Sequence, residues 1–257
     1  MVLRNLLLCG LLAGLCAGLL AAGFAGLAGE PPVDEAIAVE ESQTQVAPGE
    51  PTEPEVVSRG LQKTAGLLTA TAVYGVALGG LFALAFAVVY GRVGHAGPTT
   101  AALWLAAAAF VVLFLVPFVK YPANPPATSA EETIGDRTAL HFVMVLISLL
   151  AAIAAVRVRG ALARRWSTTT ASGGAMAVYI AVVVSAGIAL PSVSEVPRDF
   201  PATTLWEFRQ AAVGVQLVVW STIGAVFAAT AQRVIVGRPW LPSRARRSAS
   251  ATARAAD

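Results

Sequence analysis

The hydrophobic positions of the chain fall into six long blocks that short polar segments separate. The blocks have about 17 to 26 residues each, which is enough to cross about 30 Å of hydrocarbon as an α-helix. Strands of a membrane barrel have about ten residues and alternate in polarity, so apolar runs of this length are helical. The pattern predicts an all-α polytopic membrane protein with about six transmembrane helices, at 6–28, 65–90, 99–119, 139–156, 174–190 and 211–236.

The first block could also be a cleaved signal peptide, because Arg4 precedes its apolar run. Its length exceeds the usual apolar region of such a peptide, which favours a retained helix. Gly10, Gly14 and Gly18 recur at a spacing of four residues, a stripe that lets two membrane helices approach closely. Gly75, Gly79 and Gly80 in the second block indicate the same kind of packing.

Charged residues make up only 13% of the chain, too few to cover a water-facing surface, and the two signs are segregated. With the N-terminus inside, the inner segments hold 12 of the 18 basic residues and one of the 15 acidic residues, a sum of +11, while the outer segments sum to −8. Basic segments stay cytoplasmic, so we expect both termini inside. The transmembrane domain would span 1–236, with disordered segments at 42–54 and in the basic cytoplasmic tail 237–257.

A weak repeat relates the three outward-going blocks. Each ends in a proline-containing outer segment, and each return block begins near a cation: Lys63, Arg137 and Arg209. This favours three related helical hairpins, although any membrane hairpin needs prolines and cations at its ends. We expect the prolines to stop helices and shape loops, and the three cations to pair with nearby carboxylates. Carbonyls freed by the prolines of 120–126 could also line an entrance.

No nucleotide-binding or hydrolase motif is present, so the sequence predicts neither an enzyme nor a tightly bound cofactor. The candidate chemistry is an acidic outer rim with one nearby imidazole. Carboxylates attract divalent cations, and imidazole adds affinity for cobalt, nickel and zinc. The predicted metal ligands are Glu30, Asp34, His141, Glu195, Asp199 and Glu207. His141 could instead pack or bond a neighbour within the membrane.

Six stretches carry a family resemblance: GEPPVDEAIAVEE (29–41), VSRGLQKTAGLLT (57–69), YGVALGGLFALAFAVVYGR (74–92), PFVKYPANPPA (117–127), ETIGDRTAL (132–140) and VPRDFPATTLWEFR (196–209). In them the chain resembles the CbtA family, described as probable cobalt transporter subunits, from the N-terminus to about Gln232. The family is usually described with five spans, whereas hydropathy predicts six.

This resemblance implies the larger membrane subunit of a cobalt importer that serves cobalamin synthesis, in the inner (plasma) membrane. It also implies a partner, the small single-span CbtB protein with a histidine-containing terminus, which would supply imidazoles that this chain lacks. Two other possibilities stay open: a permease for nickel, another ion or a corrinoid, and an accessory membrane protein that does not transport.

Overall fold

The computed structural model of the protein describes residues 2–46, 58–93, 96–126, 128, 131–193 and 195–236. Over these residues the chain is all-helical, with 86% helix and no strands. Six continuous helices are long and apolar enough to cross a membrane, which confirms the predicted fold class and number of spans. They cover Val2–Ser42, Arg59–Val89, Pro98–Lys120, Ile134–Leu162, Thr168–Ala189 and Ala202–Ile235.

Three of these six helices contain a wider π-helical turn. The first consists of α1 (Val2–Phe24), η1 (Ala25–Gly29) and α2 (Glu30–Val46), and the second of α3 (Arg59–Leu61), η2 (Gln62–Gly66) and α4 (Leu67–Val89). The third consists of α5 (Pro98–Ala109), η3 (Phe110–Leu115) and α6 (Val116–Lys120). The remaining three are α7 (Glu131–Leu162), α8 (Thr168–Ala189) and α9 (Ala202–Val236).

The π turns explain why the first helix is longer than its apolar run. Pro31 and Pro32 do not stop this helix as expected, because they lie in the first turn of α2 directly after η1. Proline is tolerated in a first turn, and a π turn shifts the hydrogen-bond pattern that the proline ring would otherwise break. Pro117 lies likewise at the start of α6, after η3. Residues 42–46 of the expected disordered segment continue α2, and 47–54 lie outside the described residues.

A seam of glycines joins α1 to α4 and confirms the predicted close packing. A Cβ atom added to Gly14 would lie 2.8 Å from the carbonyl carbon of Gly75 and 3.0 Å from the Cα of Gly79. Gly10 faces Gly79, and Gly18 faces the backbone of Thr71 and Ala72. Only glycine permits two helix backbones to approach this closely. We call these five glycines, Gly10, Gly14, Gly18, Gly75 and Gly79, the glycine seam.

α9 packs against both α1 and α5, so these helices and α4 share one core. Its centre is aromatic: the Phe227 ring lies 5.1 Å from that of Phe82 and 5.0 Å from that of Phe86, both edge-on. Edge-to-face rings add attraction beyond their buried area. Cys9 is buried in the same core and is a free thiol, consistent with a packing role. Each of the four spans in this group is more buried inside the protein than either of the two remaining spans.

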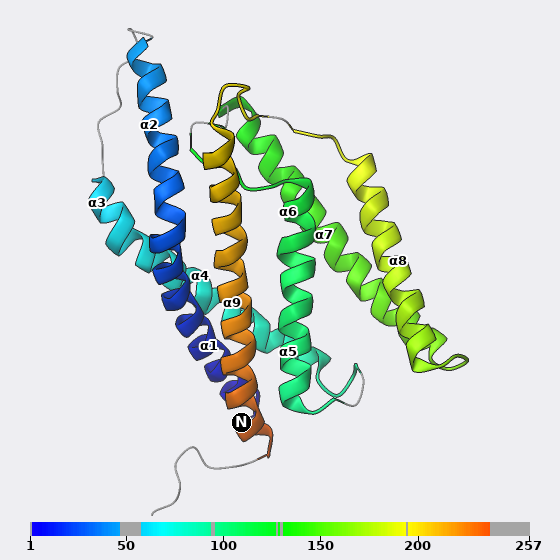
Figure 1. Ribbon diagram of the computed structural model, residues 1–257. Helices are drawn as coiled ribbons and strands as arrows, with labels where there is room; N and C mark the ends of the chain where they lie inside the picture. Colours follow the sequence, from blue (N-terminus) through cyan, green and yellow to red (C-terminus); the bar gives the residue numbers. More distant parts are fainter. Residues whose placement is uncertain are drawn as a thin grey trace, which may run out of the picture.

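α7 and α8 form a separate antiparallel pair beside that group (Figure 1). The third hairpin that the repeat predicts does not form in the described part of the chain, because α8 packs along α7 while α9 packs along α1 and α5. The connection between α8 and α9 contains Pro191, Pro197 and Pro201, which hold it out of helical conformation. It carries the chain across one end of the bundle, over α6 and the start of α7 (Figure 1).

Candidate functional site

The candidate site lies at the end of the bundle that holds α2, the loop after α6, the start of α7, the loop after α8 and the start of α9 (Figure 1). Most of the carboxylates lie at this end, so we call it the acidic end. The ion pairs seen in the described residues are all formed here. Their geometry shows which carboxylates are already occupied by cations.

On α2, Glu30 and Asp34 lie one turn apart and bind the same arginine. The guanidinium of Arg59 is 2.7 Å from Glu30 Oε2 and 3.2 Å from Asp34 Oδ1. Lys63 donates to the other oxygen of Asp34, as the sequence predicted for this cation. These pairs clamp α2 to α3 and η2. The two predicted metal ligands therefore hold together the ends of the first two helices.

Glu195 forms the most buried ion pair. Its side chain is 3% exposed, and its Oε2 accepts a hydrogen bond of 2.9 Å from Arg137 on α7. The second oxygen, Oε1, is buried without a hydrogen-bond partner. Removing one member of such a pair leaves a buried charge uncompensated, so the pair fixes the α8–α9 loop to α7.

Residues 121–124, which we call the strap, cross the acidic end after α6. Arg137 donates to the Pro122 carbonyl at 3.0 Å, and Arg209 on α9 donates to the Ala123 carbonyl at 3.3 Å. Arg209 also donates to Asn124 Oδ1 at 2.9 Å, so it binds neutral oxygens and not the rim carboxylate that the sequence predicted. The Pro122 and Ala123 carbonyls therefore accept hydrogen bonds from arginines of this chain, and an entrance lined by the carbonyls of this segment stays a prediction.

The strap is also bound to the loop after α8. The buried Tyr121 donates from its hydroxyl to the Pro191 carbonyl at 2.7 Å. Burial raises the pKa of the Tyr121 phenol, so the hydroxyl remains a protonated donor at neutral pH. Side chains from α7, α9 and the strap itself therefore hold one short segment in place.

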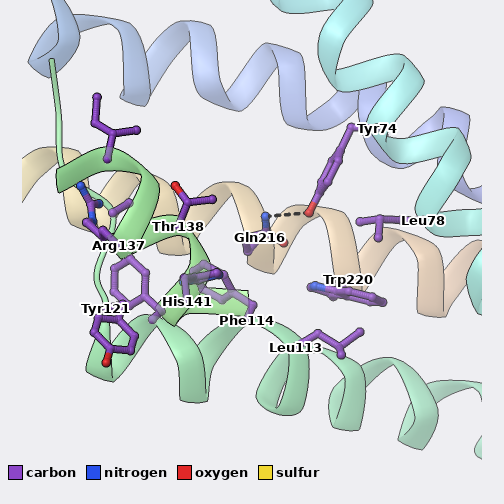
Figure 2. A pocket seen from close by; sticks show the side chains of 13 residues that line it. Tyr74, Leu78, Leu113, Phe114, Tyr121, Arg137, Thr138, His141, Gln216 and Trp220 are labelled. Carbon is purple, nitrogen blue, oxygen red and sulfur yellow. Dashed lines mark hydrogen bonds between the residues drawn. The ribbon is translucent and has the colours of Figure 1, made fainter. Parts of the chain in front are cut away.

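Beneath the strap lies a cavity of about 530 Å³, a volume typical of small-molecule sites (Figure 2). It is formed between α4, the π turn η3 with α6, the start of α7 and the middle of α9. Five of its side chains are aromatic, and none is a carboxylate. The walls include Tyr74, Leu78, Leu113, Phe114, Phe118, Tyr121, Arg137, Thr138, His141, Gln216 and Trp220.

The polar groups of this cavity come from three helices. The His141 side chain lines the cavity together with Tyr121 of the strap. Gln216 Nε2 lies 3.4 Å from the Tyr74 hydroxyl, across the cavity from His141 (Figure 2). Trp220 is 5% exposed, and its indole nitrogen is buried without a hydrogen-bond partner.

The structure disperses the six predicted metal ligands. Within the described residues, no three His, Cys, Asp or Glu side chains come together in a group that could hold a metal ion. His141 lines the cavity, Glu195 lies behind Arg137, and Glu30 with Asp34 binds Arg59. Asp199 is exposed, and Glu207 lines a separate hollow with Phe24 and Pro32. Metal binding by these residues remains a prediction.

Sequence analysis did not identify Tyr74, Gln216 and Trp220 as site residues. Gln216 is an uncharged polar residue inside a long apolar run, and a polar side chain within a membrane helix usually faces a cavity or another helix. That signal could have found it. Tyr74 and Trp220 are also ordinary residues of membrane helices, so their position on the cavity becomes visible only once the helices are packed.

The comparisons with known proteins point to one family. The model of the family described as "Probable cobalt transporter subunit (CbtA)" matches residues 3–232, which contain nearly all of the six membrane-spanning helices. No curated protein matches the chain. No solved structure matches it either.

Proposed function

Because the chain belongs to the CbtA family of probable cobalt transporter subunits, we propose that it is the membrane subunit of a transporter that takes up cobalt for cobalamin synthesis. The observation that carries this proposal is the extent of the family match, which includes the strap, the cavity and both arginines that bind the strap. The chain is a multi-pass membrane protein of a transporter family, and its proposed role is transport and not catalysis.

In the proposed orientation both termini lie in the cytoplasm and the acidic end faces outward across the inner membrane. The basic residues of the inner segments support this orientation. A membrane potential that is negative inside would then favour inward movement of a cation. The acidic end would be the entrance, since carboxylates raise the local concentration of divalent cations.

Metal capture at the entrance would use the six predicted ligands unequally. Among the six predicted ligands, Asp199 and Glu207 are exposed and would meet an approaching ion before the other four. Glu30, Asp34 and Glu195 bind cationic side chains, so each would take part only by exchanging its arginine or lysine for the metal. His141 would offer an imidazole further in, from the cavity.

The term subunit implies a partner. We propose that this partner is a small single-span protein of the CbtB type, whose histidine-containing terminus supplies the imidazoles. The chain itself has two histidines, of which His141 lines the cavity. A metal that prefers nitrogen ligands therefore needs donors from elsewhere.

The test is uptake of radioactive cobalt by cells that lack other cobalt importers and express the chain with or without the small partner. Partner-dependent uptake that survives excess nickel supports a two-component cobalt importer. Inhibition by nickel or by a corrinoid would point to those substrates instead. No uptake, with the protein shown to be in the membrane, would overturn the proposal and favour an accessory role.

The same cells test the carboxylate entrance. The double variant E30Q/E195Q should take up cobalt more slowly than the parent at equal protein in the membrane. D136N is the control for the loss of a carboxylate at this end, because Asp136 lies at the acidic end but is not among the proposed ligands. Undiminished uptake by E30Q/E195Q would contradict a role for these two carboxylates.

A further inference from the structure

The turn that joins α7 to α8 holds a cluster of arginines. It lies at the end of the bundle opposite the acidic end, apart from the N-terminus and from the end of α9 (Figure 1). Arg157 and Arg159 lie in the last two turns of α7, and Arg164 and Arg165 follow within three residues of its end. The stretch 141–194 contains no Asp or Glu. The sequence around the turn therefore offers no carboxylate to offset a charge of +4.

The structure uses one of these four arginines to join the two helices. Arg159 donates from Nε to Ser172 Oγ at 3.1 Å and so ties α7 to α8. The side chains of Arg157, Arg164 and Arg165 are exposed. In the part of the chain that the structure describes, the ion pairs lie at the acidic end, and none involves these three guanidiniums. Three uncompensated cations on a short turn attract anions.

The arginines lie at the depth of lipid headgroups. The apolar run of α7 ends near Val156, and the helix continues to Leu162, about 9 Å further at a rise of 1.5 Å per residue. A headgroup layer is about 5–8 Å thick. Trp166 follows the arginines and is 61% exposed, and exposed tryptophan is typical of this interfacial layer. The anions nearest to the turn are therefore lipid phosphates.

The face of α7 that carries Arg157 has room for a lipid. Ile153, Arg157 and Gly160 share this face, because they are spaced by four and three residues. Ile153 is 50% exposed and offers an apolar surface to an acyl chain. Nothing lies within 4 Å of a Cβ added to Gly160, so the backbone is open between Arg157 and Arg164. A phosphate at this opening would have a guanidinium on either side along the chain.

We propose that the α7–α8 turn binds the headgroup of an anionic phospholipid, with Arg157, Arg164 and Arg165 as the cations and an acyl chain along Ile153. In the proposed orientation the lipid belongs to the cytoplasmic leaflet, whose surface anionic lipids make negative. The inference goes beyond the proposed function, because it needs neither cobalt nor a partner subunit. The lipid would fix the inner end of the helix that carries Arg137 at its outer end.

The test is a thermal-shift titration of the purified full chain, freed of lipid, in an uncharged detergent. The probes are dihexanoyl phosphatidylglycerol, dihexanoyl phosphatidylcholine and inorganic phosphate. Phosphatidylglycerol should raise the melting temperature saturably, because a ligand that binds the folded state stabilises it, and added salt should weaken this binding. An equal effect of phosphatidylcholine, whose choline group neutralises its phosphate, would overturn an anionic-lipid site. An equal effect of inorganic phosphate would overturn lipid as the ligand.

The variant R164Q/R165Q should bind phosphatidylglycerol about five- to thirtyfold more weakly, because each arginine near an anionic surface contributes about a fivefold factor in affinity. R164K/R165K keeps both charges and should retain most of the affinity. R4Q/R233Q is the matched control, since Arg4 on α1 and Arg233 on α9 are also exposed and lie at the same end of the bundle.

A loss confined to R164Q/R165Q supports the site. Equal losses in R164Q/R165Q and R4Q/R233Q would show a diffuse basic surface and overturn it, and so would unchanged binding by R164Q/R165Q. If R164Q/R165Q does not fold, R157Q alone carries the test, with an expected loss of about fivefold. Unchanged binding by R157Q would then overturn the proposal.

Discussion

Substitution of Gly14 by alanine should separate α1 from α4. The added Cβ would lie 2.8 Å from the Gly75 carbonyl carbon, and nearer still to its oxygen, while ordinary contact begins at 3.4 Å. The two backbones would have to move apart by at least about 0.6 Å, and neither can yield as a flexible side chain could. Overpacking of this kind costs about 1–3 kcal/mol. Helices in a bilayer associate through close packing, so little hydrophobic gain would offset this cost.

Cys9 provides the assay, because it is 1% exposed in the core beside the glycine seam. In a C16S background it is the only thiol of the chain, and its rate of modification by a maleimide in detergent reports how often the core opens. G14A should speed this modification and lower the melting temperature by several degrees. G23A is the control, since Gly23 lies on the same helix with nothing within 4 Å of an added Cβ. If G14A and G23A behave alike, the seam does not hold α1 to α4.

The other predictions concern the acidic end. R137M should leave Glu195 as an unpaired buried charge, at a cost of about 3–5 kcal/mol. The amount of folded protein recovered on size exclusion should therefore fall, and the double variant R137M/E195Q should restore most of it. If the double variant restores none of it, the pairing of Arg137 with Glu195 is contradicted. Y121F should cost about 0.5–1.5 kcal/mol by removing the hydrogen bond to the Pro191 carbonyl, measured as a lower melting temperature. Because burial raises the pKa of Tyr121, its contribution to stability is complete below about pH 10 and is lost as the pH rises through the folded-state pKa. Melting curves of Y121F should lack this alkaline loss.

The number and class of the helices could be predicted because a bilayer fixes both the length and the polarity of a span. Their ends could not, since hydropathy detects only the part that lies in hydrocarbon. α7 begins at Glu131 and not near Ala139, and α9 begins at Ala202 and not near Ala211. The first helix extends past two prolines because a π turn precedes them, and sequence spacing gives no direct sign of such a turn.

The neighbours of each helix were only partly predictable. The glycine stripes predicted close packing for the first and for the second helix, and the structure shows that they face each other between α1 and α4. The mean apolar character of α8 and α9 gives no comparable sign of which face packs where. The predicted third hairpin required α8 to pair with α9, the helix that follows it, but α8 instead lies along α7, the helix that precedes it.

The candidate site, too, was only partly predictable: its charged residues could be found in the sequence, whereas its cavity residues are recognised only in the packed structure. Charged residues near helix ends are visible in the sequence, and three of the predicted carboxylates do occupy the acidic end in ion pairs. Because such residues stand out in the sequence, we predicted a metal site made of carboxylates. In the structure those three carboxylates instead bind lysine and arginine side chains of this chain. The cavity depends instead on Gln216 and Trp220, one turn apart on α9, and on Tyr74 and Leu78, one turn apart on α4. On helices that are apolar all round, such pairs come to face a common cavity only when the neighbouring helices are in place, so the largely aromatic lining had to come from the structure.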